Sequence, residues 1–234
     1  MDRLQFENWL KQNYPQVTPK QIAQFETYRE LIVTWNQAVN LMSRADGLDL
    51  YEKHFVDSLL FPLPEDGKHR VYIDLGTGAG FPGIPLKIMY PDYTFYLLEA
   101  TGKRADFLRR VINGLELMKI EIVNDRAEAY ASFSRETFDG LVARAVSPLN
   151  ILLELAAPLV KPNGLIYAYK GDRADVELVE ASFAMRVLSL KLVEHQLATL
   201  PLLGHNRHRL VFEKTAPTIA RYPRPYSEIK RKPL

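Results

Sequence analysis

Short apolar runs alternate with stretches of helical periodicity through the middle of this chain. The stretches at 71–74, 94–98, 119–123, 138–143 and 165–169 are four to six residues long and rich in apolar residues, although 119–123 alternates with Lys and Glu, and this pattern predicts strands. Apolar residues recur at helical spacing over 82–89, 102–113, 149–159 and 174–187, which predicts helices between those strands. This order predicts an α/β fold with a mostly parallel sheet and helices on both of its faces.

The end of the pattern differs from its middle. Two late strands, over 191–198 and 209–212, are joined by a turn that contains Gly204, and we expect them to form an antiparallel hairpin. The Pro-Asn-Gly sequence at 162–164 predicts a turn that precedes the strand at 165–169.

The first seventy residues predict helices that precede the sheet. Thr18, Pro19 and Gln21 combine an N-cap, a first-turn proline and a capping-box glutamine. A further helix is predicted over 50–61, where His54 and Asp57 lie three residues apart on one face. A helix-surface pair is the default interpretation, and the sequence assigns neither residue a role. The positions after Thr18 that have helical spacing predict a packing stripe rather than a base-stacking surface: Phe25, Tyr28, Ile32, Trp35 and Val39.

Length and composition indicate one soluble domain with a small appendage. The chain has 234 residues, of which 47% are hydrophobic, and no apolar run is long enough to span a bilayer. The absence of cysteine excludes disulfides and thiolate metal sites, and we expect no metal. The first residues lack the apolar stretch of a secretory signal, so we expect a cytoplasmic protein.

The stretch over 71–83 carries most of the functional information. Its apolar strand ends in Asp74 and is followed by closely spaced glycines: Gly76, Gly78, Gly80 and Gly83. Glycines at such positions permit positive φ and let a ligand approach the backbone, which predicts a nucleotide-binding turn. The last three glycines also match the dinucleotide pattern G-x-G-x-x-G, so the match by itself does not decide which nucleotide binds.

The residues around the glycines favour S-adenosylmethionine (SAM) over NAD. In the dinucleotide fold the first glycine usually follows the strand at once, whereas Asp74 and Gly76 come first here. The order strand, Asp, x, Gly, x, Gly, x, Gly is similar to the first motif of class I SAM methyltransferases, in which the acid organises the loop and faces the cationic methionine end of the cofactor. A terminal antiparallel hairpin is also typical of the methyltransferase sheet.

Glu99 is the second candidate for nucleotide binding. It follows the second predicted strand, 23 residues after Gly76. A carboxylate at that point can accept hydrogen bonds from both ribose hydroxyls of an adenosine, in NAD enzymes and methyltransferases alike. The alternative is a solvated glutamate at a strand end.

The segments after the later strands supply further candidates, because ligands of parallel sheets bind at the carboxyl ends of the strands. Ala127 and Glu128 follow the third strand and suit the adenine edge of a SAM pocket. Arg144 follows the fourth strand, where the proline-rich motif of many amine methyltransferases is absent, and Lys170 follows the fifth. Two cations there suit a phosphate-bearing substrate, with a structurally paired Arg144 as the alternative.

Basic residues gather at the end of the chain, although the formal net charge is only +2. Tyr222 and Tyr226 lie among them, and Glu228 is the single acid in this segment. An RNA-contacting tail would have this composition, but so would a solvated terminus. The basic residues are Lys214, Arg221, Arg224, Lys230, Arg231 and Lys232.

Taken together, these segments resemble the bacterial small-subunit ribosomal RNA methyltransferase G family, also called glucose-inhibited division protein B, over nearly the whole chain. The segments that carry the resemblance are Asn40-Leu41, His54-Phe55-Val56-Asp57-Ser58-Leu59, Asp74 to Leu86, Gly102-Lys103-Arg104 with Phe107-Leu108, Arg126-Ala127-Glu128, Ala143-Arg144-Ala145 and Lys232-Pro233-Leu234. The chain departs from relatives at Tyr169, where they often carry leucine, and at Arg224-Pro225-Tyr226, which replaces a glycine-containing stretch.

The resemblance implies a class I SAM-dependent methyltransferase, Rossmann-like, with a seven-stranded sheet. The chain would then consist of three parts: an N-terminal helical extension over 1–66, a SAM-binding core over 67–214 and a basic tail over 215–234. The implied reaction is methylation of a guanine at N7 in 16S rRNA, near the decoding centre, within the small subunit or an assembly intermediate, by a monomer. The implied SAM contacts are Gly76, Phe81, Ala127, Glu128 and Arg144, with Asp74, Gly78 and Gly80 shaping the loop and Glu99 near the ribose.

Guanine N7 carries a lone pair and no proton, so this reaction needs alignment rather than a general base, and we expect Arg144 and Lys170 to position the substrate. Three other functions remain open at the level of sequence: a NAD-dependent oxidoreductase, a SAM methyltransferase for a small molecule, and a non-catalytic RNA-binding protein with an adenosine pocket.

Overall fold

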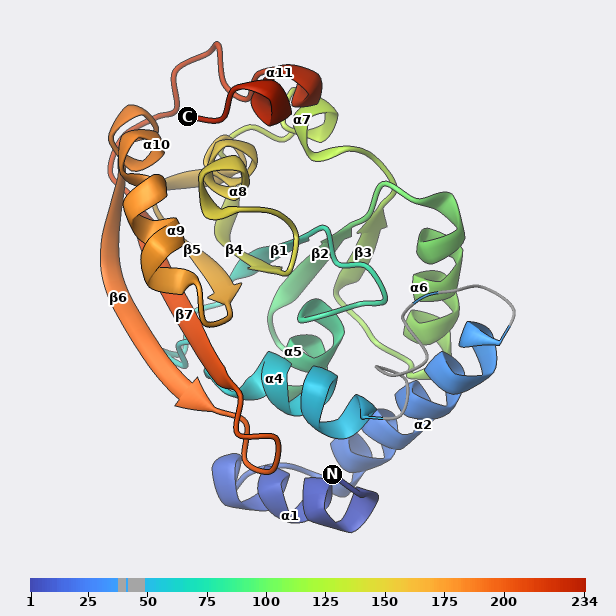
Figure 1. The fold of residues 1–234 in the computed structure, drawn as a ribbon. Helices are drawn as coiled ribbons and strands as arrows, with labels where there is room; N and C mark the ends of the chain where they lie inside the picture. The colour runs from blue at the N-terminus through green and yellow to red at the C-terminus, as the bar shows by residue number, and fades with distance from the viewer. Residues whose placement is uncertain (38–40, 42–48) are drawn as a thin grey trace.

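The computed structural model describes residues 1–37, 41 and 49–234, and these residues form a seven-stranded sheet with helices around it (Figure 1). The strand order is β3-β2-β1-β4-β5-β7-β6, and β7 is antiparallel to both of its neighbours while the other pairs are parallel. The predicted fold class and the terminal hairpin are therefore confirmed. The strands are β1 (Val71–Leu75), β2 (Thr94–Leu98), β3 (Ile120–Val123), β4 (Phe138–Arg144), β5 (Val160–Lys170), β6 (Leu190–Thr199) and β7 (Asn206–Lys214).

Helices cover both faces of the sheet. Successive strand residues enter different buried clusters: Tyr72 and Tyr167 belong to one cluster, and their chain neighbours Ile73 and Ile166 belong to the other. This is the alternation expected of a pleated strand. The first cluster includes side chains from α1 (Arg3–Asn13), α2 (Pro19–Asn36), α4 (Asp57–Leu59), α5 (Gly83–Met89) and α6 (Gly102–Gly114). The second includes side chains from α8 (Leu149–Ala156), α10 (Ser182–Val187) and α11 (Tyr226–Arg231) and is accompanied by α7 (Ala127–Tyr130) and α9 (Ala174–Glu180).

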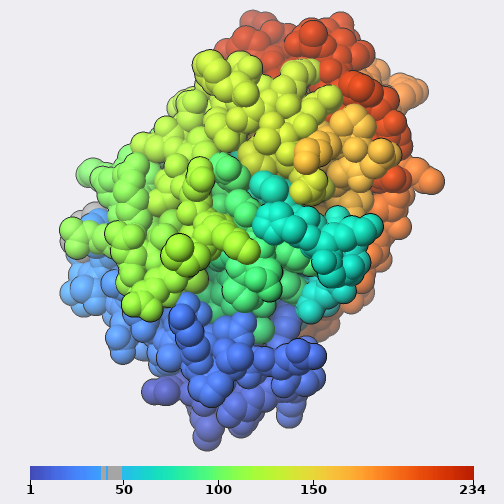
Figure 2. Space-filling model, turned by 180° about the vertical axis from the view of Figure 1, so that it is seen from behind, coloured from blue at the N-terminus to red at the C-terminus, as the bar shows by residue number. Residues whose placement is uncertain are grey.

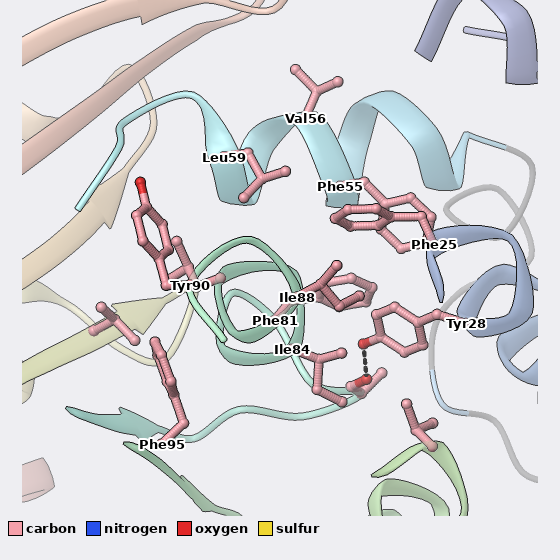
Figure 3. Packing of buried hydrophobic residues seen from close by; sticks show 14 of the residues in the cluster. Phe25, Tyr28, Phe55, Val56, Leu59, Phe81, Ile84, Ile88, Tyr90 and Phe95 are labelled. Atoms are coloured by element: carbon pink, nitrogen blue, oxygen red, sulfur yellow. Dashed lines mark hydrogen bonds between the residues drawn. The ribbon is translucent and has the colours of Figure 1, made fainter. Parts of the chain in front are cut away.

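The N-terminal helices pack directly on the first face of the sheet. The predicted capping box at Thr18 and Gln21 is present and starts α2. Phe25 and Tyr28 of α2 are fully buried and contact Phe55, and Tyr28 also contacts Phe81 of the glycine loop (Figure 3). The predicted packing stripe is confirmed for its described members, while Val39 of the stripe and Asn40 of the family resemblance lie outside the described residues.

Two predicted helices have a different internal structure. The segment over 50–61 begins as a π-helix, Tyr51–Val56, before α4. The single helix predicted over 174–187 is divided into α9 and α10, because Ala181 has φ −85° and ψ 0° and interrupts the helical path. Ala181 is fully buried at this junction, and both short helices contact α8. The break therefore lets two successive segments pack on one neighbour, which a periodicity argument does not detect.

The turn predicted at 162–164 is wrong. These residues lie inside β5, where the pairing with β4 shifts between Phe138↔Val160 and Gly140↔Leu165. The strand accommodates the extra residues as an irregularity, and Asn163 takes a positive φ of 66° within it. The asparagine and glycine that suggested a turn thus serve a bulge in a continuous strand.

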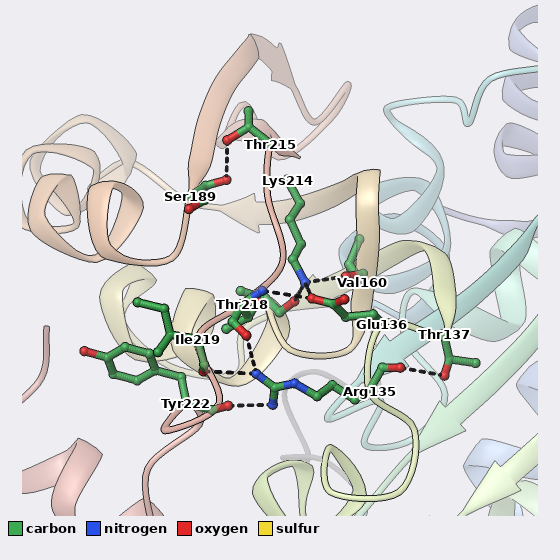
Figure 4. A network of polar contacts seen from close by, with 11 residues as sticks. Arg135, Glu136, Thr137, Val160, Ser189, Lys214, Thr215, Thr218, Ile219 and Tyr222 are labelled. Carbon is green, nitrogen blue, oxygen red and sulfur yellow. Dashed lines mark hydrogen bonds and ion pairs between the residues drawn. The ribbon is translucent and has the colours of Figure 1, made fainter.

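The C-terminal segment is docked on the core rather than solvated throughout. The Arg135 guanidinium donates hydrogen bonds to the carbonyl oxygens of Thr218, Ile219 and Tyr222 (Figure 4). Lys214 is fully buried and pairs with Glu136 at 2.7 Å. A uniformly solvated terminus is therefore the wrong alternative, although several of its basic residues are exposed, namely Arg221, Lys230, Arg231 and Lys232.

The N-terminal helices and the C-terminal segment lie at opposite ends of the molecule (Figure 2). Because the N-terminal helices share a hydrophobic cluster with the sheet, the division into an extension, a core and a tail stays a prediction. In the part of the chain that the structure describes, no helix has both the length and the apolar character needed to cross a membrane.

Candidate functional site

The glycine loop between β1 and α5 is held closed by the carboxylate of Asp74. One oxygen of this fully buried side chain accepts hydrogen bonds from the Thr77 hydroxyl at 2.6 Å and from the Gly83 amide at 2.7 Å. Its other oxygen is buried and has no hydrogen-bond partner among the described residues. Burial raises the pKa of Asp74 to about 7, since removal from water disfavours the charged form. The loop therefore places an incompletely satisfied carboxylate beside its backbone.

Gly80 shows why the loop requires glycine. It has a φ of +105°, and a Cβ at this position would lie 2.5 Å from the Tyr28 hydroxyl and from the Ile84 side chain. Tyr28 donates a hydrogen bond to the Ala79 carbonyl oxygen at 2.6 Å (Figure 3). An N-terminal helix thus supports the loop from behind, and only a residue without a side chain fits between them.

Glu99 follows β2 and reaches across to the same loop. Its carboxylate accepts hydrogen bonds from the Gly78 amide at 3.0 Å and from the Thr101 amide at 2.8 Å, and the residue is 5% exposed. The alternative of a solvated strand-end glutamate is therefore wrong. Asn124, after β3, donates to the Glu99 carbonyl oxygen at 2.8 Å, which ties the ends of β2 and β3 together. The expected contact of Glu99 with a ribose stays a prediction.

A small cavity of about 110 Å³ opens at the carboxyl ends of β1, β2 and β3. It is lined by Gly76, Ala127 and Glu128, as the sequence predicted for one site, although only structure shows that these three segments meet. The remaining lining is largely apolar and includes Leu75, Leu98, Val146, Leu155 and Tyr226. A flat aromatic ring with apolar faces, such as a purine, suits this lining.

A larger cavity of about 760 Å³ lies at the ends of β4 and β5. Both predicted substrate-positioning residues, Arg144 and Lys170, line it. Val146 lines this cavity and the small one, so the two cavities adjoin along the loop after β4. Four Lys or Arg side chains and two carboxylates line the larger cavity, which leaves a positive excess that suits an anionic ligand: Lys53, Arg144, Lys170, Arg207, Asp57 and Glu177.

Arg144 is paired within the protein, as the alternative interpretation of its position predicted, although the sequence did not identify its partners. Its guanidinium donates to Asp57 at 2.8 Å and to the Lys53 carbonyl oxygen at 2.9 Å, and it lies 2.9 Å from Nδ1 of His54. It also lies 5.0 Å from the centre of the Phe81 ring, in cation–π contact with the glycine loop. Arg144 therefore links the larger cavity to the loop through fixed contacts.

His54 and Asp57 are not the helix-surface pair that their spacing suggested. Asp57 is 5% exposed, and its second oxygen accepts a hydrogen bond from Arg207 of β7 at 2.9 Å. An acid among the apolar neighbours Phe55 and Leu59 was the available signal, because a carboxylate on a buried helix face needs a cationic partner. The partner comes from a distant strand, so the sequence could not identify it.

Lys170 is also paired within the protein. Its ammonium donates to Glu177 at 2.7 Å and to the Ser147 carbonyl oxygen at 2.7 Å. Glu177 accepts a further hydrogen bond from the Leu149 amide at 2.8 Å. Lys170 and Glu177 thus fix the segment over 147–149, next to Val146 at the boundary of the two cavities.

The site fits SAM, although the individual cofactor contacts stay predictions. A buried carboxylate oxygen without a partner at Asp74 suits a cationic group, and the apolar small cavity suits a purine. No cluster of three or more His, Asp or Glu placed to hold a metal ion occurs among the described residues.

Comparison with known proteins gives consistent matches over most of the chain. A family profile described as rRNA small subunit methyltransferase G matches residues 21–206. Ribosomal RNA small subunit methyltransferase G from Desulfitobacterium hafniense is 42% identical over 216 residues, covering 92% of this chain and 90% of the relative. The protein of the same name from Staphylococcus aureus strain Newman is 38% identical over 227 residues, covering 96% of this chain and 95% of the relative.

Solved structures confirm the fold at lower sequence identity. M. jannaschii TYW2 in complex with AdoMet has a TM-score of 0.55 at 16% identity, covering 74% of this chain and 78% of that chain. A protein from Agrobacterium tumefaciens described as a predicted O-methyltransferase has a TM-score of 0.54 at 18% identity, covering 69% of this chain and 80% of that chain. At these identities the likeness concerns the fold alone.

Proposed function

Because the chain belongs to the rRNA small subunit methyltransferase G family, we propose that it transfers a methyl group from SAM to N7 of a guanine in 16S rRNA. The observation that carries this proposal is the family match over residues 21–206, which includes every residue that lines the two adjoining cavities except Arg207 and Tyr226. The NAD-dependent and small-molecule alternatives find no support among the relatives.

The small cavity and the glycine loop form the proposed cofactor site. Gly76, Ala127 and Glu128 would contact the adenosine part, and Glu99 is close enough to the loop to serve the ribose. Bound SAM supplies a methyl group on a positively charged sulfur. The positive sulfur and the buried carboxylate of Asp74 would stabilise each other, because a nearby opposite charge favours the ionised form of an acid.

Methylation at N7 is compatible with a larger cavity whose carboxylates are all engaged in ion pairs. Guanine N7 attacks through a lone pair and loses no proton, so the site needs no general base. Both carboxylates that line this cavity are already paired, Asp57 with Arg144 and Arg207, and Glu177 with Lys170. Rate then depends on alignment, which contributes about 7–11 kcal/mol when reacting atoms are held at near-attack geometry.

Arg144 is the residue best placed to couple the two sites. It contacts the Phe81 ring of the cofactor loop and lines the larger cavity, and Asp57 and the Lys53 carbonyl oxygen fix its orientation. We expect it to direct remaining donor capacity toward the guanine or its phosphate. Lys170 is expected to act through Glu177 by fixing the loop that bounds the cavity.

The substrate we expect is a guanine presented in folded RNA. The guanine must be unstacked for its N7 to reach a methyl group in a site of this kind. In an A-form helix N7 lies in the major groove, which is too narrow for protein side chains to enter. A chain of 234 residues has few means of reading distant sequence, so we propose that a single copy acts on the small subunit or an assembly intermediate.

The test uses methyl-labelled SAM and three RNA substrates that lack the modification: small ribosomal subunits, naked 16S rRNA and a short stem-loop. We expect label in the subunit, with strand cleavage after reduction and aniline treatment at one guanine, which reports 7-methylguanine. A Glu99→Ala variant serves as the control and should lose label together with SAM binding. Label that resists the cleavage chemistry would contradict N7, and full activity on the stem-loop would contradict the assembled substrate.

A further inference from the structure

We propose that Tyr226, in the C-terminal segment, forms part of the wall against the adenine ring of SAM and contributes to cofactor affinity. This inference rests on the proposed function. The sequence placed the tail only as a candidate for RNA contact, whereas the structure brings one of its aromatic side chains to the small cavity beside Gly76, Ala127 and Glu128.

The C-terminal segment reaches this cavity because charged groups anchor it immediately before Tyr226. Arg224 donates two side-chain hydrogen bonds to Glu154 of α8, at 2.7 and 2.6 Å, and its amide donates a third at 3.1 Å. Glu154 is fully buried, so this pair is held in a low-dielectric position and fixes the chain path two residues from Tyr226.

The chain after Tyr226 is anchored as well. Tyr226 is the first residue of α11, and Ile229 on the same helix is fully buried in the second hydrophobic cluster. Asn150 of α8 donates to the Leu234 carbonyl oxygen at 3.3 Å at the chain end. Figure 1 shows α11 beside α7, the short helix that supplies Ala127 and Glu128. The tyrosine is therefore held on both sides against the cavity.

The chemistry of the lining points to a purine as the group that Tyr226 meets. The half-buried tyrosine shares the cavity with Leu75, Leu98 and Leu155, which offer apolar surface. The charged residues of the lining, Asp125, Arg126 and Glu128, all come from the single segment after β3. An aromatic side chain beside such a lining favours a flat aromatic ligand over an extended polar one. The methionine end of SAM would instead lie toward Asp74, so the contact concerns the nucleoside alone.

The test measures cofactor affinity directly, by calorimetric titration with SAM, S-adenosylhomocysteine and free adenosine. Tyr226→Ala should raise the dissociation constants of all three ligands by a similar factor, about 3- to 10-fold, which is the range that one aromatic contact contributes. Tyr226→Phe should keep affinity close to that of the unmodified protein. Lys230→Ala removes an exposed side chain of the same helix and serves as the matched control, with no change expected.

The outcomes separate this inference from the proposed function. Unchanged SAM affinity in a folded Tyr226→Ala protein would overturn the inference, as would an effect on SAM that free adenosine does not share. A raised KM for rRNA without a change in SAM affinity would assign the residue to RNA contact instead. If Tyr226→Ala does not fold, Tyr226→Leu keeps an apolar side chain there and should show a smaller loss of the same kind. Failure of the unmodified protein to bind SAM would refute the proposed function itself.

Discussion

The buried carboxylate of Asp74 should make the stability of the free protein depend on pH in an unusual direction. Burial raises its pKa from 3.8 to about 7. Between these two values the folded protein holds a proton on Asp74 that the unfolded chain has lost, so the folded state binds more protons. Stability contributed by this group is therefore present at low pH and is lost as pH rises toward the folded pKa.

The magnitude follows from the shift. One pKa unit corresponds to about 1.4 kcal/mol, so a shift of roughly three units costs about 4 kcal/mol once the folded-state carboxyl is fully ionised. Most of this change falls in an accessible range, since the loss of stability between pH 5 and pH 8 comes to about 2–3 kcal/mol.

Asp74→Asn isolates this contribution. An asparagine oxygen can accept the two hydrogen bonds that Thr77 and Gly83 donate, and the amide nitrogen takes the place of the oxygen that has no partner. Any cost of that nitrogen is the same at every pH. The free energy of unfolding of the variant minus that of the unmodified protein should therefore rise by about 2–3 kcal/mol between pH 5 and pH 8.

The assay is urea denaturation without cofactor, followed by the fluorescence of the two tryptophans, Trp9 and Trp35, at constant ionic strength. Asp139→Asn is the matched control. The pKa of Asp139 is lowered by the Val71 amide and by Lys161, against burial, so Asp139 stays ionised throughout this range and its difference should be flat. A flat difference for Asp74→Asn as well, or one that falls with rising pH, would refute the assignment of a raised pKa to Asp74.

Three further substitutions test other parts of the site. Arg144→Ala should lower the methylation rate by about 100-fold or more and weaken SAM binding, because it removes the contact to Phe81 of the cofactor loop and one partner of the buried Asp57 carboxylate. A single-turnover rate and a SAM affinity that are both unchanged would exclude the proposed role. Arg224→Met should lower the free energy of unfolding, measured by urea denaturation, by about 3–5 kcal/mol, because it leaves the charge of Glu154 buried without its cationic partner. The double variant Arg224→Met with Glu154→Gln should recover part of that loss, and equal losses in the two variants would contradict the pairing. Gly80→Ala should abolish SAM binding in titration, because its Cβ would clash with the Tyr28 hydroxyl at 2.5 Å. Gly78→Ala should retain weaker binding and be affected only by its positive φ, because the nearest described atom outside its chain neighbours, the Gly76 carbonyl oxygen, lies 4.0 Å from the added Cβ.

The order of the elements and the position of the glycine loop could be predicted from the sequence for a physical reason. Strand and helix periodicities are local, and a strand that ends in Asp74 before several glycines constrains the backbone within about ten residues of sequence. The irregular places could not be predicted in this way. The bulge at Asn163 depends on how β5 pairs with β4, and that pairing joins residues far apart in the chain.

The candidate site residues likewise include some that the sequence could identify and some that it could not. Gly76, Ala127 and Glu128 were identified separately, each at the end of a predicted strand, and the parallel sheet then brings them to one edge. Asp57 was misjudged, because its cationic partners come from β4 and β7 and no local spacing reveals them.

The sequence by itself determined the elements, the glycine loop and the family, since these depend on residue types at short spacing and on similarity along the whole chain. Only the tertiary structure decided the state of the charges and the place of the tail. Arg144 is oriented by Asp57 across 87 residues of sequence, and Arg224 carries Tyr226 to the small cavity by pairing with Glu154, 70 residues earlier. Ion pairs and cavities depend on which surfaces meet once the sheet has formed. Their residues are far apart in the sequence and become neighbours only in the folded protein.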